Sequence, residues 1–514
     1  MTADLSWPRA ERHSIPNRLR SMTARSVSAL LSAAAQAVPS RTAVIDAELE
    51  LDYADLDRAV SGLACALVEC GTRPGDIVSL ELPSSADFIV AALAILRSGA
   101  CVSAINTRLG PGEQQSILER TRPRIRIVRD EVDQARTITQ TKAREAWSGP
   151  ALDLSIDRAL EDPACIVWTS GTTGMPKGAV YSTEAMHAIS EAIGAWSITE
   201  DVRLITLPFA HVGFMTRLVD ELSKRVTMVV GAEPWSAVRQ LREIERCHVT
   251  VAGGVPTQWQ AILASPELVH TDLSSLRVVG IGAAPATPEL IHAIREAMGC
   301  PIIARYTSTE AGITTGTQLG DDPEVVAHSI GKPAPGVEIR IVSSDASTGV
   351  EPGQEGELCC RSRSMMREYF NDPMLTAETI DADGFLHTGD LVKQRPDGNI
   401  VILGRTKEMF IRGGYNVYPV EVEAALSGDD RIAAIAVIPR ADDRLGEIGI
   451  ACIVPRDSAN IPTLAELKER CALHIADYKA PDGILALPSL PLTAMGKIDR
   501  ARLRTEITHT RSTP

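Results

Sequence analysis

The sequence predicts an α/β fold, with a large N-terminal domain of parallel-sheet βαβ layers plus a β-barrel-like module, and a small C-terminal α+β domain. Three observations lead to this class. Short apolar segments alternate with helix-length segments in the first part of the 514 residues, as in βαβ units. Short strands with turn signals follow from Val337, and helices alternate with strands again after Gly404. We therefore expect one domain over residues 1–404 and another over 405–514.

The layered region begins with a predicted helix over residues 26–37 and a strand over 41–45. Apolar residues at helical spacing predict a helix over 55–70, and Gly71 stands where a left-handed glycine would end it. A further helix is predicted over 86–98. The other predicted strands of this region cover residues 76–82, 100–105, 125–128, 164–169, 202–206, 226–230, 249–252, 278–281 and 302–304.

The last third of the chain changes to shorter elements. Strands bounded by turn residues are predicted within 337–342, 356–361, 383–390 and 395–404, a pattern typical of a distorted barrel. The C-terminal domain has predicted helices over 420–425 and 464–474 and strands over 432–438, 448–454 and 484–485. About 110 residues are enough for a small domain with a core of its own.

Composition and charge exclude several classes of protein. Lys and Arg number 52 and Asp and Glu 66, a net charge of −14, so nucleic-acid binding is not expected. The longest apolar stretch, residues 88–96, is about half of a bilayer span. Residues 1–20 lack the apolar core of a secretory signal. The ten cysteines lack CxxC spacing, which favours reduced core thiols over disulfides or a metal held by protein side chains alone. We expect a cytoplasmic protein without a membrane span.

The strongest local signal is the segment 169–178 (TSGTTGMPKG), which follows an apolar strand. Glycines let the backbone approach phosphate oxygens closely, and the hydroxyl side chains supply hydrogen-bond donors. Lys177 adds a positive charge. The segment is not a Walker A sequence, because neither GK pair of the chain is followed by Ser or Thr. The pattern predicts a phosphate-binding loop rather than an ordinary surface turn.

This loop and a series of later segments together resemble the adenylate-forming enzymes, which comprise acyl-CoA synthetases, adenylation domains and luciferases. The resemblance runs in the family's order from about Leu30 to Leu503 and is closest to AMP-forming acid–CoA ligases. The later segments are 207–213 (LPFAHVG), 282–285 (GAAP), 306–310 (YTSTE), 387–390 (HTGD), 404–407 (GRTK), 413–419 (GGYNVYP) and 491–497 (PLTAMGK).

The resemblance implies a first reaction in which a carboxylate attacks the α-phosphate of ATP and releases pyrophosphate. An anion approaching a polyanion needs positive charge at the reaction centre. The family assigns the carboxylate and the bridging phosphate oxygens to Lys497, Mg²⁺ to Glu310, and a place among the catalytic and acyl-pocket residues to His211. The ATP-binding residues implied are Thr169, Ser170, Gly171, Thr172, Thr173, Gly174 and Lys177 for the β and γ phosphates, Thr309 for the α-phosphate, Asp390 and Arg405 for the ribose, and Tyr306, Gly282, Ala283 and Ala284 for adenine.

Each of these residues has a plainer interpretation when it is taken alone. Asp390 follows a Thr-Gly pair and suits a local turn cap, and Glu310 suits a helix N-terminus. Lys497 suits a solvated surface lysine, and His211 a structural histidine. The ordered set, rather than any single residue, favours the functional interpretation.

The second reaction implied by the resemblance transfers the acyl group to the thiol of coenzyme A. The resemblance implies that the small C-terminal domain is mobile and rotates between the two reactions. Lys407 matches the family's hinge position, and Gly413, Gly414, Tyr415 and Asn416 match the loop that faces the pantetheine tunnel of coenzyme A ligases. The main rival is an enzyme that loads a carrier-protein phosphopantetheine instead, and a non-catalytic nucleotide sensor is a rival of another class. The tail around Lys497 also resembles the recognition sequence of protein acetyltransferases that silence such ligases.

The acyl pocket departs from the family's usual pattern, since Ala210 replaces an aromatic residue and Arg305 and Thr307 flank Tyr306 where glycines are usual. A mostly apolar lining favours a monocarboxylic acid with an apolar or aromatic body. Arg217 leaves two interpretations, an inward partner for a second carboxylate or, as favoured, a solvated helix arginine. The predicted lining residues are His211, Phe214, Met215, Val255, Gly312, Ile313 and Thr314.

Overall fold

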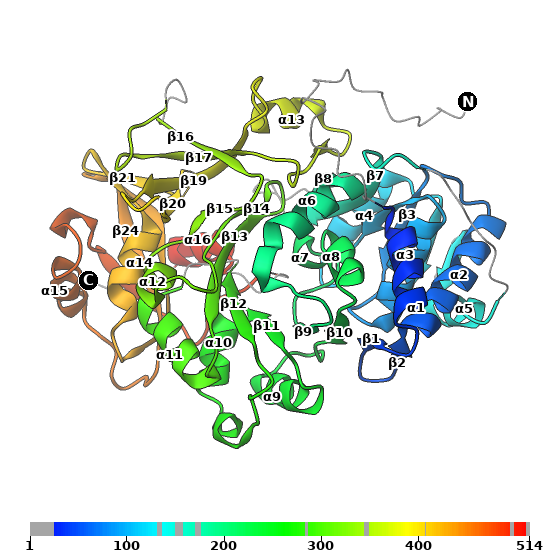
Figure 1. The fold of residues 1–514 in the computed structure, drawn as a ribbon. Coiled ribbons are helices and arrows are strands. Elements are labelled where there is room, and N and C mark those ends of the chain that lie inside the picture. The colour runs from blue at the N-terminus through cyan, green and yellow to red at the C-terminus, as the bar shows by residue number, and fades with distance from the viewer. Residues whose placement is uncertain are drawn as a thin grey trace.

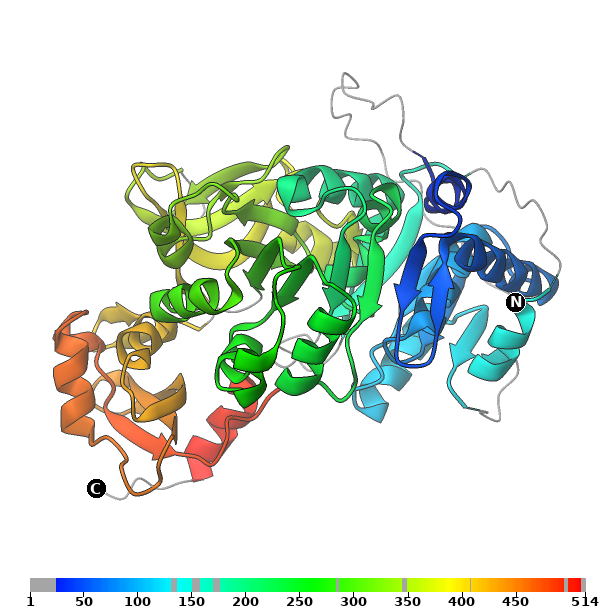
Figure 2. The same ribbon diagram turned by 60° about the horizontal axis from the view of Figure 1, so that its bottom comes forward.

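The computed structural model describes residues 25–130, 136–149, 158–169, 176–282, 286–343, 349–406, 408–493 and 498–509. Two mixed sheets, with helices packed on them, make up the larger part of the molecule (Figure 1). A four-stranded sheet adjoins them, and a separate C-terminal sheet lies at the opposite end from the N-terminal helices (Figure 2). This arrangement confirms the predicted α/β class.

The seven-stranded sheet has the order β18-β8-β7-β4-β3-β5-β6 and is parallel from β7 to β6. Strands β8 and β18 add an antiparallel edge beside the predicted phosphate-binding loop. The strands are β3 (Ile77–Glu81), β4 (Cys101–Ala104), β5 (Ile125–Val128), β6 (Thr137–Thr139), β7 (Pro163–Thr169), β8 (Lys177–Ser182) and β18 (Glu368–Tyr369).

The nine-stranded sheet has the order β15-β14-β13-β12-β11-β9-β10-β1-β2, with a parallel centre and antiparallel edges. Strand β13 is longer than predicted, because it forms an antiparallel hairpin with β14 that carries the motif 306–310 at its end. The strands are β1 (Thr42–Ile45), β2 (Glu50–Asp52), β9 (Val202–Ile205), β10 (Thr227–Val230), β11 (Val251–Gly254), β12 (Val278–Gly282), β13 (Ile302–Ser308), β14 (Gly312–Gly316) and β15 (Lys332–Pro333).

Most helices of this part begin at side-chain caps and bury apolar residues. Ser26 and Asp52 cap the first two helices, and Gly71 takes a φ of +90° beyond the second, as predicted. The helices are α1 (Val27–Ala37), α2 (Tyr53–Glu69), α3 (Ala86–Arg97), α4 (Pro111–Thr121), α5 (Gln140–Ala146), α6 (Thr183–Ile193), η1 (Gly194–Trp196), α7 (Val212–Met215), α8 (Leu218–Ser223), α9 (Ala237–Arg246), α10 (Pro256–Leu263), η2 (Pro266–His270), α11 (Pro288–Met298), α12 (Pro323–His328) and α13 (Pro373–Thr379).

The β-rich module expected from Val337 is a four-stranded antiparallel sheet of the order β16-β17-β19-β20. Within the described residues, β16 and β20 lie at the two edges of this sheet and do not pair with each other. In a closed barrel these two strands would be paired. The strands are β16 (Glu338–Val342), β17 (Glu355–Arg361), β19 (Leu386–Gln394) and β20 (Ile400–Arg405).

The C-terminal part has its own sheet and a core centred on residues such as Phe410, Val437 and Leu467. Leu503 and Ile507 of helix α16 pack in a second apolar cluster, with Ile438 and Ile450, although the helix's polar sequence did not predict it. The elements are β21 (Phe410–Arg412), β22 (Tyr415–Val417), α14 (Pro419–Ser427), β23 (Ile432–Asp442), β24 (Gly446–Pro455), α15 (Leu464–Ala472), η3 (Asp477–Lys479), β25 (Gly483–Ala486) and α16 (Arg500–His509).

Arg500 fixes the start of α16 to the rest of the C-terminal part. Its guanidinium donates to the Val437 carbonyl at 3.0 Å and to the Glu423 carboxylate at 2.9 Å. Burial raises the pKa of Glu423 although Arg500 opposes that shift, so the carboxylate depends on its partner to remain charged. The residues just before α16, which include Lys497, are therefore attached to a firmly held helix.

Arg500→Met should lower the free energy of unfolding of the C-terminal part by about 3 kcal/mol, because it leaves Glu423 buried without its cation. Arg502→Met is the matched control, since that side chain is 68% exposed and its loss should change stability by less than about 0.5 kcal/mol. Urea unfolding of the full chain, followed by hydrogen exchange in β23, measures both. Equal effects of the two substitutions would contradict this account.

Candidate active site

Asp390 is a buried carboxylate to which two of the predicted ATP-binding residues are hydrogen-bonded. Tyr306 on β13 donates its hydroxyl to Asp390 Oδ2, and Arg405 at the end of β20 donates Nε to Oδ1 at 2.8 Å. Asp390 is 4% exposed and pairs with Arg405 across strands β19 and β20. Burial, and then the Asp390 charge, raise the pKa of Tyr306 well above its usual range, so the phenol stays protonated as a donor.

The part of strand β19 just before Asp390 is held by Glu357 on β17. Its Oε1 accepts the Gly389 amide at 2.8 Å, and its Oε2 lies 3.0 Å from His387 Nδ1. Gly389 has a φ of +72°, a conformation that glycine adopts without strain. Cys359 Sγ lies 3.4 Å from the same His387 nitrogen. Glu357 thus fixes the backbone that presents Asp390, although no spacing in the sequence connects them.

A second group of site residues converges on Tyr369. Its hydroxyl donates to Glu310 Oε1 at 2.8 Å, and Lys177 Nζ lies 5.8 Å from the centre of its ring. Tyr181 donates its hydroxyl to the Thr309 carbonyl at 2.7 Å, which fixes the turn after β13. The predicted residues Lys177, Thr309 and Glu310 therefore lie together. Sequence reasoning missed the two tyrosines, because their partners are distant in the chain and only the fold joins them.

His211 begins helix α7 and accepts the Gly213 amide on Nδ1 at 3.2 Å. The segment around it is fixed by a cluster of phenylalanine rings. Phe209 and Phe214 stack with centroids 4.0 Å apart, and Phe88 meets them edge-on at 5.6 and 6.2 Å. Such aromatic contacts stabilise one arrangement of the rings. Phe214 therefore belongs to the core beneath His211.

The other predicted pocket residues lie on or next to α7, β14 and α10. Met215 ends α7, Gly312, Ile313 and Thr314 form β14 directly after the Glu310 turn, and Val255 precedes α10. Met215 and Thr314 are fully buried.

The favoured interpretation of Arg217 as a solvated helix residue is wrong. Only 20% of its side chain is exposed, because it precedes α8 and packs beside Asp220 and Glu221.

The predicted coenzyme A loop is the tip of the β21–β22 hairpin. Gly413 and Gly414 have φ values of +57° and +87° and form its two-residue turn, as type I′ hairpins require. Tyr415 is exposed and stacks on Tyr478 at 4.5 Å. Asn416 lies on β22. The tip extends from the C-terminal sheet, and a side chain added at Gly414 would meet no other atom within 4 Å at its Cβ.

Several predicted residues lie outside the described part of the chain: Ser170, Gly171, Thr172, Thr173, Gly174, Ala283, Ala284, Lys407 and Lys497. Their neighbours are placed, with Thr169 and Lys177 paired across β7 and β8 and Gly282 at the end of β12. Leu492 and Ile498 form a bridge on the two sides of the Lys497 segment.

Comparison with known proteins shows the family to which this chain belongs. The family model for the AMP-binding enzyme matches residues 31–370, and that for the AMP-binding enzyme C-terminal domain matches residues 421–497. The chain belongs to the AMP-binding enzyme family. This membership confirms the resemblance to adenylate-forming enzymes that the motifs indicated.

Individual members of the AMP-binding enzyme family resemble the chain over nearly its whole length. A 3-[(3aS,4S,7aS)-7a-methyl-1,5-dioxo-octahydro-1H-inden-4-yl]propanoyl:CoA ligase of Rhodococcus jostii is 32% identical over 93% of this chain and 98% of its own. An indoleacetate–CoA ligase of Aromatoleum aromaticum is 31% identical over 91% and 95%. The structure of an anthranilate CoA ligase, AuaEII, with anthranoyl-AMP matches with a TM-score of 0.86 and 26% identity over 94% and 97%.

Other findings bear on the class of this AMP-binding enzyme. Across the described residues, no helix has both the length and the apolar character needed to cross a bilayer. Eight of the ten cysteines are buried, as expected for thiols of the core, and none of the ten forms a disulfide.

Proposed function

We propose that the protein is an AMP-forming acid–CoA ligase, which activates a carboxylic acid as an acyl-adenylate and then transfers it to coenzyme A. The observation that carries this proposal is the group of Asp390, Tyr306 and Arg405 beside the turn of Thr309 and Glu310. The group offers acceptors for ribose and contacts for phosphate in one place. The ligase names of the Rhodococcus and Aromatoleum relatives support the same chemistry.

In the first step, the acid's carboxylate oxygen attacks the α-phosphorus and pyrophosphate leaves. Asp390 accepts the ribose hydroxyls, since each of its oxygens keeps an acceptor site beyond its present hydrogen bond. The ring of Tyr306 is oriented by that bond and stacks on adenine. Lys177 and Lys497 supply the positive charge that two anions need to approach each other in a protein of net charge −14.

Mg²⁺ fits the carboxylate of Glu310, because hard oxygen donors are the ligands this ion prefers. Tyr369 donates to Glu310 Oε1, which orients the carboxylate of Glu310 and leaves Oε2 available to the ion. When bound, the ion would neutralise phosphate charge.

In the second step, the thiol of coenzyme A attacks the carbonyl carbon of the adenylate and AMP leaves. We propose that the C-terminal domain, residues 405–514, turns about Lys407 between the two steps. This movement would exchange Lys497 for the Gly413–Gly414 turn at the active site. The small glycine turn leaves room for the pantetheine arm.

The acid we propose has an apolar or aromatic body, as do the acids in the names of the two relatives. ATP and coenzyme A are both available in the cytoplasm, where the ten cysteines would also stay reduced. We therefore propose a cytoplasmic enzyme.

Pyrophosphate release over a panel of aliphatic, aromatic and dicarboxylic acids, each with and without coenzyme A, tests the proposed function. We expect acid-dependent release that coenzyme A accelerates, with a thioester of the matching mass. Release that only a phosphopantetheinylated carrier protein accelerates would replace the proposal with the carrier-loading alternative. Absence of release with every acid would contradict adenylation.

Asp390→Asn should raise the KM for ATP about tenfold or more, because it removes a charged acceptor of the ribose. Asp397→Asn is the control, since Asp397 is a turn aspartate whose pKa is lowered mainly by the Asn399 amide. Steady-state kinetics with thermal melts separate binding from stability. An unchanged KM for ATP would contradict the assigned role.

Lys497→Ala should abolish adenylation yet leave thioester formation from supplied acyl-AMP largely intact. Lys468→Ala, at a half-exposed lysine of α15, should spare both reactions. Acetylation of Lys497 by a protein acetyltransferase, followed by mass spectrometry, should reproduce the alanine variant because it removes the same charge. Equal loss of both half-reactions would refute this role.

Gly414→Leu should do the opposite, sparing adenylation while it slows thioester formation. A leucine there meets open space but strains a residue whose φ is +87°. Gly353→Leu is the matched control, because Gly353 has a φ of +94° and an equally open surrounding in another turn. If both variants slow the thioester step alike, the loop has no special part in it.

A further inference from the structure

Arg305 is a partly buried arginine that lacks a carboxylate partner among the described residues. Its Nη2 donates to the Ile193 carbonyl at 2.8 Å, while its Nη1 is buried without a hydrogen-bond partner. A Cβ added at Gly316 would lie 2.5 Å from that Nη1, so the glycine makes room for the guanidinium. Buried polar groups are nearly always paired, so an unpaired donor calls for an explanation.

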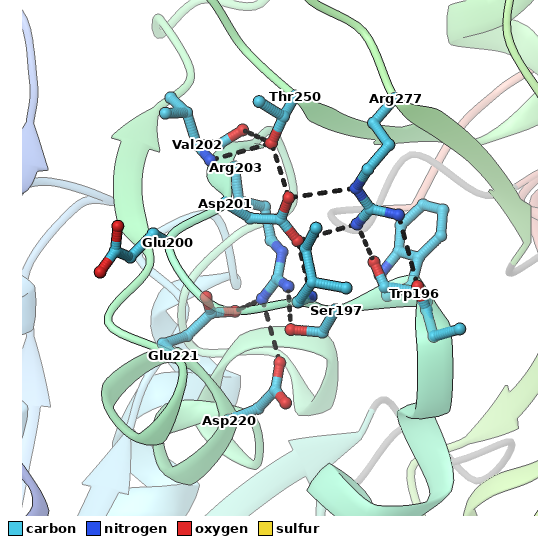
Figure 3. Close-up of polar contacts among 12 residues, drawn as sticks. Trp196, Ser197, Glu200, Asp201, Val202, Arg203, Asp220, Glu221, Thr250 and Arg277 are labelled. Carbon is cyan, nitrogen blue, oxygen red and sulfur yellow. Dashed lines mark hydrogen bonds and ion pairs between the residues drawn. The ribbon is translucent and has the colours of Figure 1, made fainter.

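A second arginine with unused donors, Arg217, lies beside Asp220 and Glu221. Figure 3 shows these two acids with Arg203. Arg203 donates from Nη1 to Glu221 Oε1 and, at 3.3 Å, to Asp220 Oδ2, while Glu221 Oε2 is buried without a hydrogen-bond partner. Ser190 donates its hydroxyl to the other carboxylate oxygen of Asp220, Oδ1, at 2.9 Å. Arg217 lies 3.6 and 3.7 Å from the two carboxylates, beyond hydrogen-bonding distance.

Arg203, Arg217 and Arg305 outnumber the two acids, Asp220 and Glu221, which leaves a net charge of 3 − 2 = +1 in this largely buried group. Burial first, and then the neighbouring charge of Arg217, lower the pKa of Arg305 to about 10. The guanidinium is still charged at neutral pH. An uncompensated buried cation is unfavourable, and such groups concentrate where a ligand supplies the missing partner.

The position of the two arginines relates them to the acyl group rather than to ATP. Side chains alternate along a strand, so Arg305 lies on the face of β13 opposite to Tyr306, which is bonded to Asp390. That face is covered by α6, whose last carbonyl receives Arg305. Arg217 follows α7, the helix that His211 begins. Both arginines therefore border the predicted acyl-pocket segments.

We infer that Arg305, with Arg217 beside it, binds an oxygen at the far end of the acyl group. The substrate is then an acid whose apolar body ends in a keto or carboxylate oxygen, which accepts the hydrogen bonds that the protein leaves open. This inference rests on the proposed ligase function and names a specificity residue and a substrate class within it.

The test compares three acids of one shape: 3-phenylpropanoic, 3-(4-acetylphenyl)propanoic and 3-(4-carboxyphenyl)propanoic acid. We expect kcat/KM for pyrophosphate release to be about tenfold or more higher for an acid with the distal oxygen, as a hydrogen bond to a charged group allows. Arg305→Met should remove this preference and leave the value for 3-phenylpropanoic acid unchanged. Arg242→Met, at a side chain that is 69% exposed, should keep the preference.

Equal kcat/KM for the three acids in the native enzyme would overturn the inference and leave the ligase function standing. Absence of release with all three acids, and with the wider panel, would overturn the function and the inference together.

Stability measurements separate binding from a structural role. Arg305→Met removes an unpaired buried cation, so its melting temperature should equal or exceed that of the native enzyme. A lower melting temperature together with equal losses on all three acids would mean that Arg305 is structural and would overturn the inference.

Discussion

The buried carboxylate of Asp390 connects two sheets of the molecule. Tyr306 reaches it from the nine-stranded sheet, while Asp390 and Arg405 belong to the neighbouring strands β19 and β20 of the four-stranded sheet. A charge buried to this extent is stable only with such partners. Glu357 accepts the Gly389 amide and so fixes the backbone of β19 just before Asp390. The same contacts that stabilise the junction of the sheets therefore also shape the proposed nucleotide site.

The chain is strongly acidic, yet its proposed substrates are anions, and this conflict explains how its cations are distributed. Lys177 lies over the ring of Tyr369, whose hydroxyl is bonded to Glu310, and Arg405 is bonded to Asp390. Arg305 differs, because its charge has no such acid among the residues that the structure describes. A site that is preorganised for negative charge gains its free energy when the ligand arrives. We see the unpaired guanidinium as part of the same design.

Local features of the sequence predicted the elements well. Ser26, Asp52 and Gly71 begin and end helices as their side chains or φ angles allow, and the parallel strands follow short apolar runs. Contacts between distant segments were not predictable from one sequence. Tyr181 and Tyr369 became visible only when the fold placed their hydroxyls on the Thr309–Glu310 turn, and Arg217 was misjudged because helical spacing does not show which neighbour covers a side chain. The resemblance supplied Asp390, whose burial no local pattern indicated.

The central claim is that a carboxylate oxygen of the acid becomes bonded to the α-phosphorus of ATP. Turnover of an acid labelled with ¹⁸O in its carboxylate, with ATP and coenzyme A, tests this bond directly by mass spectrometry of the products. The account predicts one ¹⁸O in AMP, one in the thioester and none in pyrophosphate. Unlabelled AMP, or label in inorganic phosphate, would contradict it.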